Sequence, residues 1–96
     1  MNLKNYTIKS QEAIQEAQNL AIANDQQAIE NGHLLKGIFN VDENVTPFIL
    51  KKLNVNTVNF EKALDRVIET YPKVSGGNPY LSNAANQSIV KASTYL

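Results

Sequence analysis

Residues 6–39 read Y-T-I-K-S-Q-E-A-I-Q-E-A-Q-N-L-A-I-A-N-D-Q-Q-A-I-E-N-G-H-L-L-K-G-I-F, and this stretch decides the fold. One stripe of small and apolar residues recurs at helical spacing: Ala13, Ile14, Ala17, Leu20 and Ala21. Alanine favours helix and lets a neighbouring helix approach closely. We therefore expect a helix from Thr7 to Asn24, with Thr7 as its N-cap and a turn at Asn24-Asp25.

The next two expected helices are shorter and more apolar. The second starts near Gly32-His33, and its apolar residues fall on what we expect to be a broad inward face: Leu34, Leu35, Ile38 and Phe39. Ile29, in the polar loop before it, is expected to be a buried anchor. The third helix is expected to begin at Thr46-Pro47, since proline is tolerated in a first turn, and to end at Asn54. Its apolar residues are Phe48, Ile49, Leu50 and Leu53.

The fourth and fifth helices flank a stretch rich in glycine and proline. The fourth runs from Asn56 or Thr57 to Tyr71, with Leu64 and Ile68 in the core, and Pro72 ends it. On its polar face, Asp65 and Glu69 are expected to pair with basic neighbours on the same helix. The fifth opens at Ser82, with apolar positions at Leu81, Ala85, Ile89, Ala92 and Leu96. No strand pattern of useful length appears, so we predict an all-α bundle of about five helices.

Composition fits one small globular domain. The chain has 96 residues, no cysteine and a formal net charge of zero, which excludes disulfides and gives no reason to expect nucleic acid or an anionic membrane as a partner. No signal peptide and no stretch of membrane-spanning length is present, so we expect a soluble cytoplasmic protein.

The first and last expected helices can be aligned with each other. A shift of 75 positions brings Thr7 onto Ser82, Ile14 onto Ile89 and Ala17 onto Ala92, as in an internal repeat whose second copy stops after one helix. Any two amphipathic helices can be aligned in this way, so both interpretations stay open on the pattern alone.

Several separated motifs together resemble the N-terminal repeat domain of Clp chaperones, and most of all the disaggregases of that family. They are T-x-K from Thr7, A-x-x-x-A-x-x-L-A from Ala13, I-E-x-x-H-L-L from Ile29, and P-K-V-S-G-G-x-P-Y-L-S from Pro72. The resemblance implies one complete four-helix repeat in residues 1–71, a linker in 72–80, and the first helix of an incomplete second repeat in 81–96. It also implies a fragment of a longer protein or a short paralogue.

The implied role is a non-catalytic module that binds unfolded or aggregated protein clients for an ATP-dependent chaperone. The nucleotide sites would lie in modules absent from this chain, and the full-length protein would be a hexamer. The fragment alone is expected to be a monomer or a weak dimer. An alternative in the same family is the N-domain of a protease regulatory subunit, which docks an adaptor protein.

The resemblance also points to residues of a substrate groove. Thr7 matches a family residue at the groove's edge, and Tyr95 matches in kind. Two departures stand out. Lys91 replaces an apolar groove position, and Asn31-Gly32 stands where the family usually has proline after the I-E pair.

A remote alternative is a small helical enzyme built around His33, Glu30 and Asp25. His33 is the only histidine, so a metal site is poorly supported, and we expect a structural histidine bonded to the preceding loop at Glu30. Gly76-Gly77 lacks the rest of a phosphate-binding loop, G-x-x-x-x-G-K-[ST]. We therefore expect no catalytic residue, no metal and no cofactor in this chain.

Overall fold

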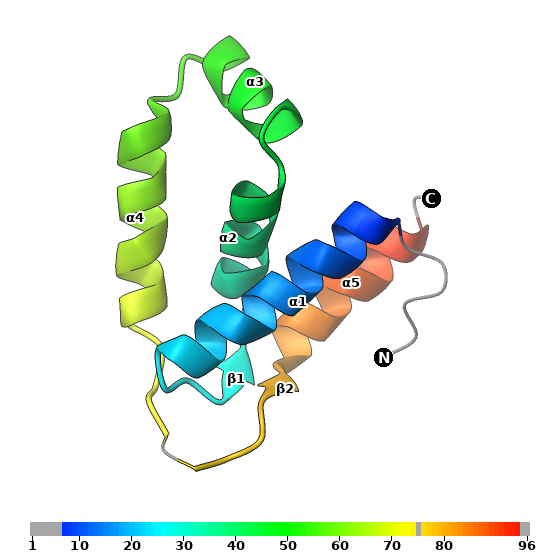
Figure 1. Ribbon diagram of the computed structural model, residues 1–96, viewed down its shortest axis with the longest axis vertical. Helices are drawn as coiled ribbons and strands as arrows, with labels where there is room; N and C mark the ends of the chain where they lie inside the picture. The colour runs from blue at the N-terminus through cyan, green and yellow to red at the C-terminus, as the bar shows by residue number, and fades with distance from the viewer. Residues whose placement is uncertain (1–6, 75, 95–96) are drawn as a thin grey trace.

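The computed structural model describes residues 7–74 and 76–94, and within them five helices and two short strands follow one another (Figure 1). The helices are α1 (Ile8–Ala23), α2 (Asn31–Val41), α3 (Val45–Lys52), α4 (Thr57–Glu69) and α5 (Asn83–Thr94). The strands are β1 (Ala28–Ile29) and β2 (Tyr80–Leu81). The prediction of an all-α bundle of about five helices is confirmed in its helices, and the two strands of two residues each are an addition that it did not include.

Side chains expected as helix caps occupy those positions. Thr7, Asn56 and Ser82 each accept, at 3.0–3.1 Å, the backbone N–H of the residue three positions further on. Each bond satisfies one of the free donors at a helix start. At the other end of α1, Asp25 takes a positive φ of 56°, which turns the chain sharply out of the helix. The fourth helix ends at Glu69, two residues before the expected Tyr71.

The closest contact between helices joins α1 to α2. The buried face of α1 is its row of alanines, Ala13, Ala17 and Ala21. Gly37 of α2 lies directly against this row: a Cβ atom added to Gly37 would meet the Ala13 carbonyl oxygen and lie 3.2 Å from the Ala17 nitrogen. The backbones approach this closely only because both helices carry small residues at the contact.

The inward face that we predicted for α2 is partly confirmed, since Leu34 packs against the core and Phe39 stacks on an aromatic ring of α4. For Leu35 and Ile38 the prediction is wrong. Leu35 and Ile38 are 37% and 43% exposed. The buried residues of α2 are instead Gly32, His33, Lys36 and Gly37. Hydrophobicity alone misplaces the face, because the glycines are buried by close backbone contact and the two polar residues are buried with partners.

Helix α4 is held to α2 by apolar packing and by one ion-pair cluster. Leu64 and Ile68 are buried, as predicted. The Lys36 ammonium, on a side chain only 11% exposed, lies 2.6 Å from Glu61 and 3.0 Å from Asp65. Asp65 therefore pairs across helices and not within α4 as expected. Burial alone would lower the pKa of Lys36, but the hydrogen bonds to both carboxylates outweigh it and raise that pKa.

Two strands of two residues each tie the start of α5 to the loop before α2. They pair in parallel, with Ala28 opposite Tyr80 and Ile29 opposite Leu81. Ile29 is buried with the alanines of α1, which confirms it as an anchor. In the segment expected as a linker, the Val74 N–H donates to the Asp25 carbonyl at 2.8 Å. Figure 1 shows this segment running from α4 round the end of α1 to β2.

Gly37→Ala tests the contact between α1 and α2. Alanine favours helix by up to about 1 kcal/mol over glycine, but here its Cβ would collide with the Ala13 carbonyl. We expect a net loss of about 1–3 kcal/mol in the free energy of unfolding, the usual cost of overpacking. Denaturant titration followed by circular dichroism measures it. Asn40→Ala, on an exposed position of α2, is the control and should not destabilise. Equal stability of the wild type and Gly37→Ala would contradict the close contact.

Candidate binding groove

A groove of roughly 420 Å³ lies between α1, α2 and α5. We call it the apolar groove. Most of its lining is aliphatic, with short polar side chains at the margins: Ser10, Ala13, Ile14, Asn31, Leu34, Leu35, Ile38, Ser88, Ile89 and Ala92. Each helix contributes residues at helical spacing, so each turns one face to the groove.

Within the described residues, α5 is buried most deeply near its start. Ala85 is fully buried and Leu81 packs against the core, whereas Ala92, two residues from the end of α5, is exposed. Ile89 lies between these extremes and faces the groove. Leu35 and Ile38, which we expected to be inward, form the opposite wall and stay partly accessible. These accessible aliphatic side chains can contribute apolar contact to a ligand.

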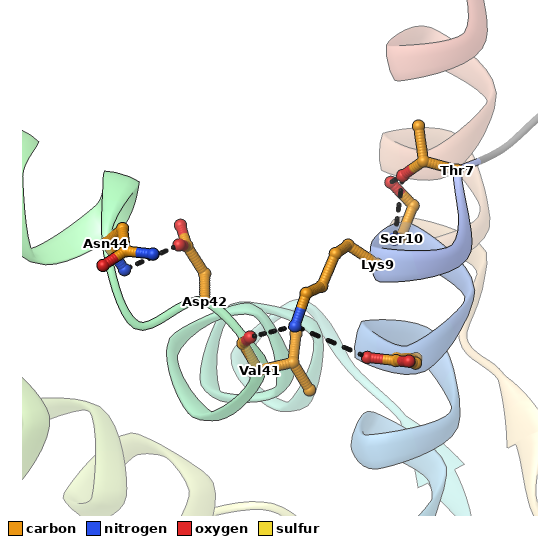
Figure 2. Close-up of polar contacts among 7 residues, drawn as sticks. Thr7, Lys9, Ser10, Val41, Asp42 and Asn44 are labelled. Atoms are coloured by element: carbon orange, nitrogen blue, oxygen red, sulfur yellow. Dashed lines mark hydrogen bonds and ion pairs between the residues drawn. The ribbon is translucent and has the colours of Figure 1, made fainter.

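A second hollow, of roughly 560 Å³, continues from the first toward α3. The two share Ser10, Ala13 and Ile38. The second is more polar, and Figure 2 shows the start of α1 facing the end of α2 there. The Lys9 ammonium crosses between them and donates to the Val41 carbonyl at 3.2 Å. Together the two hollows form a trough that is apolar near α5 and charged near α3.

Asp42 lies in the charged part of the trough, and its carboxylate is fully engaged in hydrogen bonds with the start of α3. Its carboxylate accepts the backbone N–H groups of Asn44, Val45 and Thr46 and the Thr46 hydroxyl, at 2.7–3.1 Å (Figure 2, for Asn44). The Thr46 hydroxyl, followed by the backbone donors of Val45, Asn44 and Thr46, lowers the pKa of Asp42 far below its usual range. These four bonds give Asp42 a structural role as a cap.

Thr7, a predicted groove residue, lies next to the apolar groove and not in its lining. It is exposed, and its hydroxyl donates to the Ser10 hydroxyl at 3.0 Å (Figure 2). Ser10 itself lines both hollows, so a single hydrogen bond connects Thr7 to their lining. Tyr95, the other predicted groove residue, lies outside the described part of the chain.

His33 is fully buried in a chain of hydrogen bonds that joins three segments. Its Nδ1 accepts the Glu30 backbone N–H at 2.9 Å, so Nε2 carries the proton and donates to the Gln26 side-chain oxygen at 2.6 Å. The Gln26 amide nitrogen in turn donates to the Ile68 carbonyl of α4 at 2.6 Å. The Tyr71 ring lies against the imidazole, with ring centroids 5.1 Å apart.

This network leaves His33 no atom for catalysis. Both ring nitrogens have protein partners and the ring has no exposed surface, so a substrate cannot reach it. Asp25 is exposed and is not among these partners. Burial lowers the pKa of His33, partly opposed by the negative charge of Glu30. The remote alternative of a small enzyme built on His33, Glu30 and Asp25 has no supporting geometry.

Other classes of site are absent from the described residues. No group of three or more His, Asp or Glu side chains is placed to hold a metal ion in residues 7–74 and 76–94. Among the helices of the same ranges, none is long and apolar enough to cross a membrane.

The family model and the relatives that match this chain agree on one family. Residues 5–95 match the Clp repeat (R) N-terminal domain. The chain is 53% identical over 95 residues to the chaperone protein ClpB of Bacteroides thetaiotaomicron, which covers 99% of this chain and 11% of that protein. ClpB of Porphyromonas gingivalis is 48% identical over 92 residues, covering 96% and 11%. ClpB of Vibrio cholerae is 39% identical over 88 residues, covering 88% and 10%. The chain spans about a tenth of the length of these relatives. No solved structure matches it significantly.

His33→Gln tests the structural role of the buried histidine through pH. The folded protein binds a proton at His33 less readily than the unfolded chain, because burial lowers the pKa from 6.5. The contribution of neutral His33 is therefore complete above about pH 6.5 and is lost as the pH falls below it. We expect the wild type to be more stable than His33→Gln at about pH 7.5, and the gap to narrow by about pH 5.

Chemical denaturation of both proteins at several pH values measures this gap. Charged groups distant from His33 are the same in the two proteins, so their effects cancel in the difference. Two stability curves that stay parallel across this range would show that His33 is not held neutral by the fold.

Proposed function

The chain belongs to the Clp N-terminal repeat family, and from that premise we propose that it is a protein-binding module of a ClpB-like chaperone. Its ligand is unfolded or aggregated polypeptide, and the apolar groove is the surface that receives it. The observation that carries the proposal is this groove: aliphatic, open and bordered by three helices.

The dimensions and lining of the groove suit apolar side chains of a client. A volume of roughly 420 Å³ falls within the range of ordinary ligand sites. Short polar side chains at its margin, Ser10, Asn31 and Ser88, can hydrogen-bond a client backbone without selecting a sequence. Recognition of this kind tolerates many sequences, as a binder of unfolded chains requires.

Affinity for a single segment should be weak. A flexible client must be ordered on binding, and this entropy offsets much of the apolar contact. A shallow groove covered on three sides buries less of the client than a closed pocket does. Weak binding favours release, and a module that hands its client onward needs release.

The wider setting is also a proposal. The relatives are named chaperone protein ClpB and are about nine to ten times longer than this chain. We propose that ATP is bound in modules outside these 96 residues, that the full-length protein assembles as a cytoplasmic hexamer, and that residues 1–71, 72–80 and 81–96 are the first repeat, the linker and the start of a second repeat. Thr7 and Tyr95 remain proposed residues of the groove's edge.

Ile38→Asp tests the proposed groove. Ile38 is 43% exposed and lines both hollows. A carboxylate there would have to lose water when an apolar client binds, so we expect affinity for a short fluorescent peptide rich in leucine and phenylalanine to fall about tenfold, or 1.4 kcal/mol. Fluorescence anisotropy measures it.

Val67→Asp is the matched control. Val67 is 47% exposed in the last turn of α4, so the substitution adds the same charge at a similar depth and helix position, but outside the groove. It should leave the affinity unchanged. Equal loss in both variants would indicate a general charge effect, and no loss in Ile38→Asp would contradict the proposed site.

A further inference from the structure

The binding function does not explain why glycine follows Asn31. The chain has 13 asparagines, and only Asn31 is followed by glycine. We propose that Asn31 is a deamidation site and that a hydrogen bond to the Tyr71 hydroxyl slows the reaction in the folded protein. Deamidation would place a carboxylate in the lining of the apolar groove.

The chemistry needs only water. The Gly32 backbone nitrogen, after losing its proton to a base in the solvent, attacks the Asn31 side-chain carbonyl carbon, and ammonia leaves. A five-membered cyclic imide results. Water then opens the imide at either carbonyl, which gives aspartate or isoaspartate. One water is consumed and one ammonia released overall. Glycine favours the ring closure because it has no side chain to hinder the attacking nitrogen.

In the structure Asn31 is exposed, but the Gly32 nitrogen that would attack it is held in a hydrogen bond. Asn31 is exposed as the first residue of α2, so the N–H of Gly32 falls in the first turn, where no helical acceptor exists. This N–H instead donates to the Tyr71 hydroxyl at 3.1 Å. The contact is tight: a Cβ at Gly32 would lie 2.5 Å from the same hydroxyl oxygen. Ring closure therefore requires this hydrogen bond and the first turn of α2 to open.

Deamidation would change the groove, a consequence that rests on the proposed function. Asn31 lines the apolar groove, so a carboxylate there would be desolvated by an apolar client. The isoaspartate form also adds a backbone carbon between Glu30 and His33. It would shift the bond from the Glu30 N–H to the His33 ring, which is 2.9 Å long here.

Mass spectrometry of proteolytic peptides, after incubation at mildly alkaline pH, measures the rate at Asn31. In the folded wild type we expect slower conversion than in the same chain unfolded in guanidinium chloride. Tyr71→Phe should raise the folded-state rate by about two- to tenfold, the change in an opening equilibrium expected from losing one ordinary hydrogen bond. Leu50→Ala is the control: it destabilises the fold from α3 and keeps the Tyr71 hydroxyl.

Three results would overturn the proposal: equal rates in the folded and unfolded wild type, no faster conversion in Tyr71→Phe than in the wild type, or an equal acceleration by Leu50→Ala. The first comparison uses only the wild type, so it decides even if Tyr71→Phe does not fold. For the groove, Asn31→Asp should weaken binding of the leucine-rich peptide more than Asn31→Gln does, because only the first substitution adds a charge to the lining. Equal affinities of the two variants would contradict this consequence. If the wild type binds no peptide, the proposed function fails while the rates at Asn31 stand.

Discussion

The rest of the structure depends on the close contact between the alanine row of α1 and Gly37 of α2. The Ala13 carbonyl lies where a Gly37 side chain would be, so the two helices cannot separate without losing their main interface. This contact uses the small residues of α2. Its larger aliphatic residues, Leu35 and Ile38, are then left on another face, where they form a wall of the apolar groove. The groove is thus a consequence of how α1 and α2 pack.

A second layer of constraint is polar and joins α4 to this pair. The His33–Gln26–Ile68 chain of hydrogen bonds and the Lys36 cluster both connect α2 to α4. The first is buried, whereas in the second only Lys36 is, since its two carboxylate partners are 40% and 55% exposed. Buried polar groups of this kind fix one arrangement, because any shift leaves a donor or charge unpaired. The core is otherwise built mainly of alanine, leucine and isoleucine. The only histidine and one lysine can lie within it because both have hydrogen-bond or ion-pair partners there.

Local rules predicted much of the fold from sequence. The caps at Thr7 and Asn56, the turn at Asp25 and the core positions Leu64 and Ile68 depend on neighbouring residues alone. The inward face of α2, the partner of Asp65 and the pairing of β1 with β2 depend on residues far apart in the chain, and no local pattern encodes them. In the candidate site, Ile89 and Ala92 belonged to the predicted stripe of the fifth helix. Leu35 and Ile38 were assigned to the core because apolar spacing cannot distinguish a buried face from a groove wall.

The central claim is that polypeptide binds the apolar groove, although α3, its C-cap and α4 expose more prominent apolar side chains, including Phe48 at 60% and the C-cap residue Leu53 at 66%. Titration of the isotope-labelled protein with a short apolar peptide, followed by amide chemical shifts, distinguishes the two surfaces directly. The account predicts that the shifts gather at Ala13, Leu35, Ile38 and Ile89 and leave α3 unchanged. Shifts concentrated at Phe48, Leu53 and Val58, with the groove residues unmoved, would contradict it.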